Sequence, residues 1–451
     1  MMYYCPMPKY IMSETIVKIA GKTAAELFDS IRALTQAGEL LPGQELPTVR
    51  ELAATLGVNR NTVSLAYQRL VTAGIAVTQG RLGTAIRAQR DPGEQEGLLP
   101  GSPLADLGGG NPNLAWLPDV GAALARKPYR PRLYGEATVD SELEVLARRW
   151  LAGDCPEGHD ITVTNGAVDA VERLLGAYLA AGDKVAVEDP CFVSSINTLR
   201  IAGLHAVGVA VDAEGMQAGA LERALAQGVQ AVIVTPRAHN PTGCSLSAAR
   251  ADQLRAVLAA YPHVLVIVDD HFSLLSVARY QDVIPPAARR WALVRSVSKI
   301  FGPDLRLAIV ASDGQTAQRL RLRLAPGTNW VSHLLQDAVS ACLSSPDVSA
   351  QVVLARADYA RRRDMVAAAL AAQGLVCTSP ADGLNLWLPL PLPDSSQAAV
   401  LALARHGWLV RGGEAFGVQA LAQGLRITVS AIDEAGAQAF ARVLAQVLSR
   451  P

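Results

Sequence analysis

Residues 296–306, SVSKIFGPDLR, decide the fold of most of this chain. They follow the apolar run 291–294, which is typical of a buried strand, so Lys299 is expected where that strand ends in a loop. Burial lowers the pKa of a lysine, and a lysine tuned in this way can form a Schiff base. Arg306 follows seven residues later, and its planar guanidinium is suited to a phosphate. For Lys299 alone, a surface lysine in a turn is the simpler interpretation, so the surrounding sequence must decide.

Short apolar runs alternate with helical stretches from residue 105 onward. The runs are ITVT, KVAVE, AVIVTP, VLVIVDD, ALVRS and LAIVAS, and helices are expected over 167–180, 194–201 and 247–260. This alternation predicts an α/β fold in which helices cover a mostly parallel sheet. Ligands of such sheets bind beyond the carboxyl ends of the strands, so the residues that follow each run are candidates for a site.

The residues at these strand ends form one chemically consistent set. They are Asn165-Gly166-Ala167 at a helix start, Phe192 in DPCF, Asn240 in NPTG, Asp269-Asp270-His271, and Ser298-Lys299. Pyridoxal phosphate requires a lysine, an aromatic ring, phosphate donors and a carboxylate that keeps its ring nitrogen protonated. Each residue alone also fits a simpler role, as a helix cap, a turn residue or a core residue, but the whole set favours a cofactor site.

A different pattern fills residues 15–88. A helix is expected over 23–36, and Thr48 with Glu51 forms a capping box at the start of TVRELAATLG. After Gly57, Asn59 caps a second helix that ends at Gly74, and 75–77 with 83–86 form a hairpin. Two short helices joined by a glycine turn and followed by a hairpin predict a winged helix-turn-helix.

The second helix of that motif is expected to read DNA. Its first residues would enter the major groove, while arginines outside it would hold phosphates or the minor groove. From residue 50 to residue 87 there are five arginines and one acid, although the whole chain balances 41 basic against 41 acidic residues. A protein-binding module is the alternative, but the turn spacing and the basic residues favour an operator in double-stranded DNA. The DNA-binding candidates are Arg50, Arg60, Asn61, Thr62 and Arg81.

Composition narrows the remaining choices. Six cysteines are scattered without a C-x-x-C pair, which predicts reduced thiols, a cytoplasmic protein and no metal site. No apolar run reaches about 18 residues, so no membrane segment is expected. The predicted organisation is a tail over 1–14, the winged helix over 15–88, a flexible Pro/Gly/Glu/Gln-rich linker over 89–104 and the α/β domain over 105–451.

These motifs carry family resemblances. LPTVRELAATLGVNRNTVSLAYQRL resembles the GntR regulators, and HNPTG, SVSK and PDLR, in that order, resemble the fold-type I aminotransferases. That second resemblance implies a large subdomain with a mixed or parallel sheet and a smaller C-terminal α+β subdomain. A winged helix fused to such a domain is similar to the MocR/GabR branch of the GntR family, and NRNTVSLAYQRL and IVDDHFSLL resemble its PtsJ-type members.

The resemblance implies the roles of the cofactor site. Lys299 would form the Schiff base with pyridoxal 5'-phosphate, and Asp269 would pair with the pyridine nitrogen. Asn240 would donate to the phenolic oxygen, and Phe192 would stack on the ring. The phosphate would be bound by Gly166, Ala167, Ser296 and Arg306, with Ser298 as a further cofactor-binding residue.

It also implies contacts beyond the cofactor. Tyr134 would reach the phosphate of the partner subunit, and residues 107–113 resemble a loop that closes over substrate. Arg426 would grip a substrate carboxylate, although spacing alone fits a surface arginine as well. His271 stands where the family usually has a tyrosine that faces the phenolic oxygen, Val139 replaces a glycine, and Phe192 replaces a tyrosine. These departures favour cofactor binding over efficient transamination.

The sequence is therefore interpreted as a cytoplasmic, DNA-binding regulator that senses pyridoxal phosphate or an amine, amino-acid or B6-vitamer effector. By the same resemblance it would form a head-to-tail homodimer and control genes of vitamin B6 or amino-acid metabolism. The alternative is an active aminotransferase whose N-terminal module is an accessory.

Overall fold

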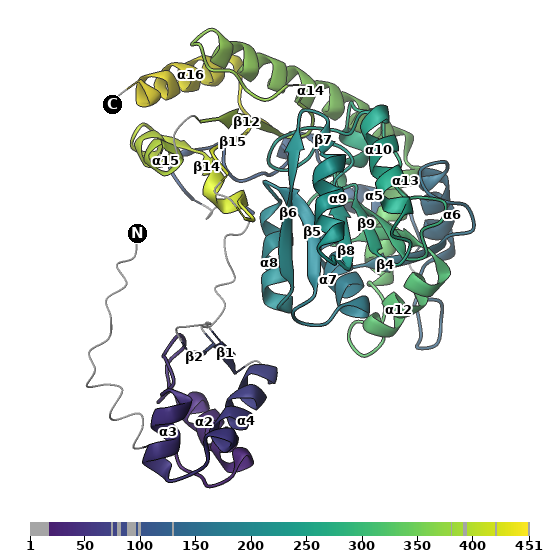
Figure 1. The fold of residues 1–451 in the computed structure, drawn as a ribbon. Coiled ribbons are helices and arrows are strands. Elements are labelled where there is room, and N and C mark those ends of the chain that lie inside the picture. Colours follow the sequence, from purple (N-terminus) through teal and green to yellow (C-terminus); the bar gives the residue numbers. More distant parts are fainter. Residues whose placement is uncertain are drawn as a thin grey trace. The chain divides into compact units, whose positions relative to one another are not determined.

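The computed structural model describes residues 18–73, 75–78, 83–87, 96–97, 101–128, 130–379, 381–390, 395–419 and 422–449. The chain folds as two compact units, an N-terminal unit over 1–91 and a large unit over 92–451 (Figure 1).

The N-terminal unit has the predicted winged helix-turn-helix architecture. Thr48 and Glu51 form the expected capping box, Gly57 ends the first helix of the motif with φ +64°, and Asn59 caps the second. Gly74 and the turn at 79–82 lie outside the described residues. The elements are α2 (Ala24–Gln36), α3 (Val49–Leu56), α4 (Arg60–Thr72), β1 (Ala76–Thr78) and β2 (Thr84–Ile86).

One small core holds this unit together. Leu27, Leu52, Val63 and Leu70 are fully buried in it, one or two from each helix, as the helical spacing of apolar residues requires. β2 pairs antiparallel with β1 and also bonds to residues 43–46 on its other edge, where Leu46 N donates to Thr84 O. The hairpin is thereby tied to the chain between α2 and α3.

The large unit, drawn in Figure 1, is built on an eight-stranded sheet. Its strand order is β4-β11-β10-β9-β8-β5-β6-β7. The pairs from β10 through β9, β8 and β5 to β6 are parallel, while β11 runs against its neighbours β10 and β4. The strands are β4 (Asp160–Thr164), β5 (Lys184–Asp189), β6 (His205–Asp212), β7 (Gly215–Met216), β8 (Ala231–Val234), β9 (Leu265–Asp269), β10 (Trp291–Ser296) and β11 (Ala308–Ser312).

Each face of this sheet is buried under helices, which explains why its strands are apolar throughout. Val266 and Val268 of β9 pack into one core, whereas Leu265 and Ile267 pack into the other. The first core includes residues of α6 (Ser141–Leu151), α9 (Ala218–Ala226), α10 (Ala248–Ala259) and α13 (His333–Ser344), and the second includes residues of α7 (Ala167–Tyr178), α8 (Val193–Ala202) and α12 (Gly314–Leu324). The predicted α/β class is confirmed.

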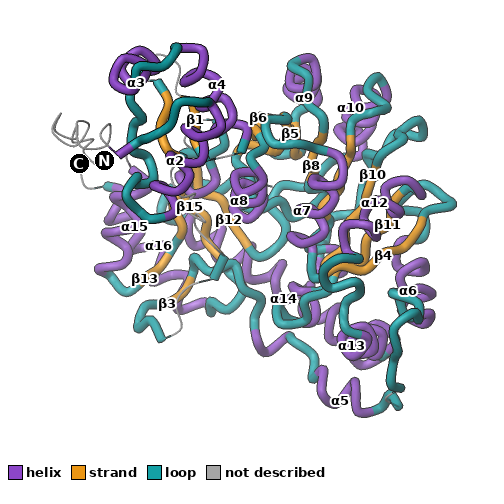
Figure 2. The backbone as a smooth tube through the Cα atoms, turned by 90° about the horizontal axis from the view of Figure 1, so that it is seen from below, coloured by secondary structure: helices purple, strands orange, loops and turns teal. Residues whose placement is uncertain are grey.

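A smaller α+β subdomain follows, also as predicted, and Figure 2 shows its strands β12 and β15 apart from the large sheet. Its antiparallel sheet has the order β12-β15-β14, and β13 pairs with β3. The elements are β3 (Ala105–Asp106), α14 (Pro346–Ala371), β12 (Asn385–Pro389), α15 (Ser395–Arg405), β13 (Trp408–Leu409), β14 (Arg411–Gly412), β15 (Gly424–Thr428) and α16 (Glu434–Leu448). The other elements within the described residues are α5 (Val120–Ala125), α11 (Ser298–Phe301) and the 3-10 turns Leu114–Trp116, Ser273–Leu275 and Gly413–Phe416.

Among the described helices, none by itself has the length and apolarity to cross a membrane, although the pair α13 and α14, bent by 75°, meets both measures together. In the described part of the chain all cysteines are free thiols, and no three His, Cys, Asp or Glu side chains are grouped so as to hold a metal ion.

Candidate functional site

The carboxyl ends of the central strands open into one cavity of about 600 Å³. Its wall contains nearly all of the cofactor candidates that sequence reasoning proposed, together with Glu96 from the expected linker. The residues of interest in the wall are Glu96, Ala167, Phe192, Thr235, Asn240, Asp269, His271, Ser296, Ser298, Lys299 and Arg306.

Lys299 lies in α11, one turn after β10, with its amine inside this cavity. Its Nζ donates to the carbonyl of Gly110 at 2.5 Å. Burial lowers the pKa of Lys299, opposed by the charge of Glu96 and assisted by that of Arg426. A buried amine with a lowered pKa is the form of lysine that attacks a carbonyl carbon.

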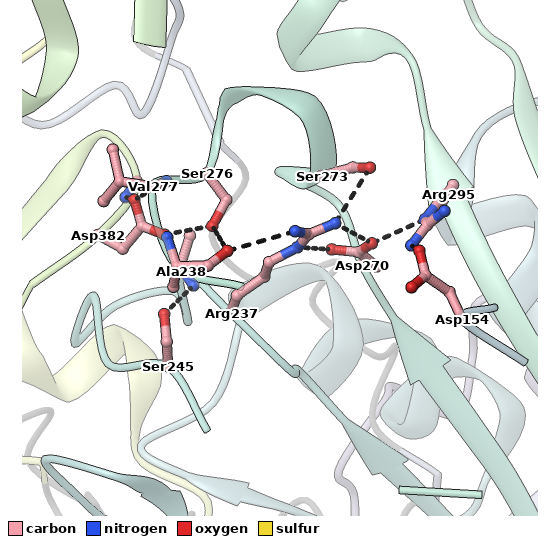
Figure 3. Close-up of polar contacts among 12 residues, drawn as sticks. Asp154, Arg237, Ala238, Ser245, Asp270, Ser273, Ser276, Val277, Arg295 and Asp382 are labelled. Atoms are coloured by element: carbon pink, nitrogen blue, oxygen red, sulfur yellow. Dashed lines mark hydrogen bonds and ion pairs between the residues drawn. The ribbon is translucent and has the colours of Figure 1, made fainter. Parts of the chain in front are cut away.

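Asp269 ends β9 and Asp270 follows it, and the two carboxylates lie in different environments. Asp270 accepts two hydrogen bonds from Arg237, at 2.7 and 2.8 Å, and one from Arg295 at 2.8 Å (Figure 3). Asp269 lines the cavity, and its Oδ1 is buried without a hydrogen-bond partner among the described residues. Burial and the neighbouring charge of Asp270 raise the pKa of Asp269 to about 7. The orphaned oxygen of Asp269 is thus ready for a positively charged donor.

One part of the cavity wall is formed where α7 begins. Gly166 caps this helix with φ +94° and makes no side-chain cap, so the first N–H groups of α7 are directed outward. A Cβ added at Gly166 would lie 3.2 Å from an Nη atom of Arg306. Ser296 Oγ accepts from Ser298 N at 3.2 Å, which orients the Ser296 hydroxyl group, and both serines line the cavity.

Arg426 lies on β15 and is fully buried, so it is not a surface residue. It donates to Asn240 Oδ1 at 3.0 Å, to the carbonyl of Gly108 at 2.5 Å and to the carboxylate of Glu96. The fold thus brings β15, the NPTG turn and the loop that follows β3 together.

His271 and Phe192 complete the wall. Burial and the nearby charge of Lys299 lower the pKa of His271 to about 4, so its imidazole is neutral at neutral pH. Phe192 is the N-cap residue of α8, which places its ring at the end of β5. Thr235, which sequence reasoning missed, donates to the buried Glu188 from both its N–H and its hydroxyl.

Two expectations concern surfaces that lie outside the cavity. Tyr134 has 94% of its surface exposed in the single chain, with its ring 5.6 Å from that of Trp330. In the N-terminal unit, Arg50, Arg60 and Asn61 are exposed and Thr62 is half-buried. Arg81 lies outside the described residues.

The sequence did not predict the roles of Glu96 or of the two arginines that bind Asp270. Glu96 stands in a polar segment without periodicity, and its partners lie far away in sequence. Arg237 lies in TPRAHNPTG, which is typical of a turn, and Arg295 lies in ALVRS, which is typical of a strand. Neither pattern indicates that both arginines bind Asp270.

Fold and site together define a class: a winged-helix, DNA-binding regulator with a domain of the fold-type I aminotransferase architecture. The model of bacterial regulatory proteins of the gntR family matches residues 23–86, and that of aminotransferase class I and II matches residues 103–444. The chain belongs to the GntR-family transcriptional regulators that carry this aminotransferase-like domain, the MocR-like branch.

Similar proteins support this family assignment. The vitamin B6 salvage pathway transcriptional repressor PtsJ of Salmonella typhimurium is 55% identical over 96% of this chain and all of that protein. The pyridoxine biosynthesis transcriptional regulator PdxR of Corynebacterium glutamicum is 29% identical over 76% of this chain and 77% of its own. Pyrococcus horikoshii kynurenine aminotransferase shares the fold of the large unit, with a TM-score of 0.69 and 23% identity over 77% of this chain and 91% of that one.

Proposed function

We propose that this regulator binds pyridoxal 5'-phosphate in the cavity of the large unit, and that its affinity for operator DNA changes when the cofactor or an effector binds there. The observation that carries the proposal is the buried, unpartnered Oδ1 of Asp269 in the same cavity as the amine of Lys299. A carboxylate and a lysine amine in one cavity are the groups that the ring nitrogen and the aldehyde of the cofactor would need.

The residues present fit the cofactor. Asp269 would hold the protonated ring nitrogen, Phe192 would cover one face of the ring, and Asn240 and His271 would face the phenolic oxygen. Gly166 leaves the space that a Cβ would fill beside Arg306, as a bound phosphate requires. When bound, the cofactor supplies an aldehyde for an amine and a ring that withdraws electrons.

The chain's own groups would then act in defined ways. Lys299 would give up its proton readily because burial lowers its pKa. The neutral imidazole of His271 would donate through one nitrogen and accept through the other, so it cannot supply the fixed hydroxyl donor that a tyrosine would. Arg426 would hold the carboxylate of an effector with two parallel hydrogen bonds.

The effector class follows from these donors and from the relatives. Two of them are named for vitamin B6 salvage and pyridoxine biosynthesis, which supports a role for this chain in vitamin B6 metabolism. Arg426 in turn supports an amino acid or another amine with a carboxylate as the effector. A ligand alters the regulator only if it binds one of its arrangements better than another.

The same proposal includes a cytoplasmic, head-to-tail homodimer. The exposure of Tyr134 in the single chain supports a role toward a partner's phosphate. The alternative activity, transamination, is favoured by the presence of Lys299, Asp269 and Arg426 in one region, but His271 and the regulator relatives favour sensing over turnover.

An experiment with two readouts tests the proposal. The purified protein is incubated with pyridoxal phosphate, treated with borohydride and digested, and the peptide that contains Lys299 is weighed. A pyridoxyl mass on Lys299, together with a cofactor-dependent change in footprinting on the promoter region of its own gene, is the expected result. An unmodified Lys299 would refute the cofactor assignment, and turnover of amino donors without specific DNA retention would establish the enzymatic alternative.

A further inference from the structure

The carboxylate of Glu96 fills the fork of Arg426. Its Oε1 lies 2.5 Å from Nη1 and its Oε2 lies 2.9 Å from Nη2. Asn240 Nδ2 donates a third hydrogen bond to Oε1 at 3.1 Å. Two parallel hydrogen bonds from a guanidinium are the arrangement in which arginine recognises carboxylates. Glu96 therefore takes the position that the carboxylate of a ligand in this cavity would need.

The backbone is adapted to this contact. Gly97 N donates to the carbonyl of Gly109 at 2.9 Å, and its own carbonyl accepts from Arg411 at 3.2 Å. Gly110 has φ +67°, and a Cβ there would fall 2.5 Å from Oε2 of Glu96. Residues 96 and 97 are thus held through both main chain and side chain.

The charges explain why Glu96 pairs with Arg426. The Arg426 side chain is fully buried, and a buried guanidinium without a counter-charge is costly. Burial opposes the ionisation of Glu96, but Arg426, Lys299 and Arg411 more than offset it, so the pKa of Glu96 is lowered. Only 20% of the Glu96 side chain is exposed. The chain supplies its own carboxylate to a site built for one.

We propose that Glu96 is an internal ligand of the Arg426 subsite, and that the effector is an amine with a carboxylate that acts by displacing it. The inference rests on the proposed function, because both concern the same cavity. Glu96 is five residues along the chain from Asp91, where the N-terminal unit ends. Displacing it detaches the chain that leads to the DNA-binding unit, which gives the effector a route to the operator.

Competition sets the size of the effect. A tethered group competes at an effective concentration on the order of millimolar, so a free carboxylate binds more weakly than the contacts alone would allow. Replacing Glu96 by glutamine keeps its shape but removes the charge that pairs with Arg426. Ligands with a carboxylate should then bind at least about tenfold more tightly, and ligands without one should be unaffected.

The test uses full-length protein and two matched probes. N-phosphopyridoxyl-L-alanine carries phosphate, ring and carboxylate, and N-phosphopyridoxyl-ethylamine lacks only the carboxylate. Titration calorimetry compares the natural protein with Glu96→Gln and with Glu94→Gln, which removes the same charge two residues away. We expect Glu96→Gln to tighten the alanine probe at least about tenfold and leave the ethylamine probe within about twofold, while Glu94→Gln matches the natural protein.

A second measurement follows Glu96 directly. In the natural protein, the alanine probe should speed cleavage after Glu96 by a glutamyl endopeptidase, and the ethylamine probe should not. Equal effects of Glu96→Gln on both probes, or cleavage that is indifferent to the alanine probe, would overturn the inference while leaving cofactor binding intact. If neither probe binds the natural protein or either variant, both the proposed cofactor binding and this inference are wrong.

Discussion

Asp269 and Asp270 are adjacent in sequence, yet one carboxylate faces the cavity without a partner while the other is bound by Arg237 and Arg295. Asp269 is the last residue of β9 and Asp270 is the next residue along the chain, so neighbouring side chains at one strand end serve both purposes. Arg295 also donates to Asp154, which extends the network to the residues after α6 (Figure 3).

The first prediction concerns the stability of this network. Asp270→Asn leaves the buried Arg237 and Arg295 without their counter-charge, and breaking a buried pair from one side costs about 3–5 kcal/mol. We expect the unfolding transition of the large unit to move to markedly lower denaturant, as followed by circular dichroism. Asp252→Asn is the control, since Asp252 pairs with Arg255 on the surface and such pairs contribute about 0–1 kcal/mol. Equal shifts for the two variants would contradict a structural role of Asp270.

A second prediction is a pH dependence of the cofactor-free protein. Because the folded pKa of Asp269 is raised to about 7 from an ordinary value of 3.8, the unfolded chain loses this proton first. Stability therefore falls as pH rises from about 4 to about 7 and then levels off. Asp269→Asn cannot titrate, so the difference in unfolding free energy between the two proteins should change across this window. If the difference in unfolding free energy between the two proteins did not depend on pH, the pKa of Asp269 would not be raised in the folded protein.

The third prediction separates sensing from DNA binding. Lys299→Ala removes the only proposed covalent attachment of the cofactor but alters no residue of the N-terminal unit. Gel shifts should show unchanged operator affinity in the absence of cofactor and no response to pyridoxal phosphate. Lys184→Ala, at the start of β5, should respond like the natural protein. A Lys299→Ala variant that still answers the cofactor would rule out this assignment. A tenfold response needs only about 1.4 kcal/mol of coupling.

The fourth prediction concerns the recognition helix. Arg60 is the first residue of α4 and is exposed, so Arg60→Ala should weaken operator binding by about 1–3 kcal/mol, or roughly 5- to 150-fold, in fluorescence anisotropy. Arg69→Ala, in the last turn of the same helix, should have the smaller effect. The cofactor absorbance should be the same in both variants. Equal losses would indicate general charge attraction and not groove recognition.

Local signals made much of this fold predictable. The capping box at Thr48, the Asn59 cap and the apolar strands of the large sheet depend on neighbours in sequence, and each formed as expected. Strand β6 was not predicted, and only Val207 and Val209 of HAVGVAVD are buried while the other residues are half-buried or exposed. The small sheet joins strands separated by loops of several lengths, so its register depends on contacts that sequence does not display.

The site was predictable to the extent that it follows strand ends. Lys299, Asp269 and Asn240 converge because parallel strands end on the same edge of the sheet. Glu96 could not be found in this way, because its position depends on a fold of the chain around β15 and not on its neighbours. The pairing of Asp270 with Arg237 and Arg295 likewise joins three separate strand ends.

The carbonyls of Gly108 and Gly110 accept from Arg426 and Lys299, so these two cations already have partners within the chain. A ligand that binds Arg426 and Lys299 must first break these hydrogen bonds. Its binding free energy is therefore the difference between the new contacts and the old ones. Such a sensor has a dose–response midpoint set by the strength of the resting contacts as much as by the ligand. Substitutions that weaken those contacts would shift the midpoint to a lower ligand concentration without changing any residue that contacts the ligand.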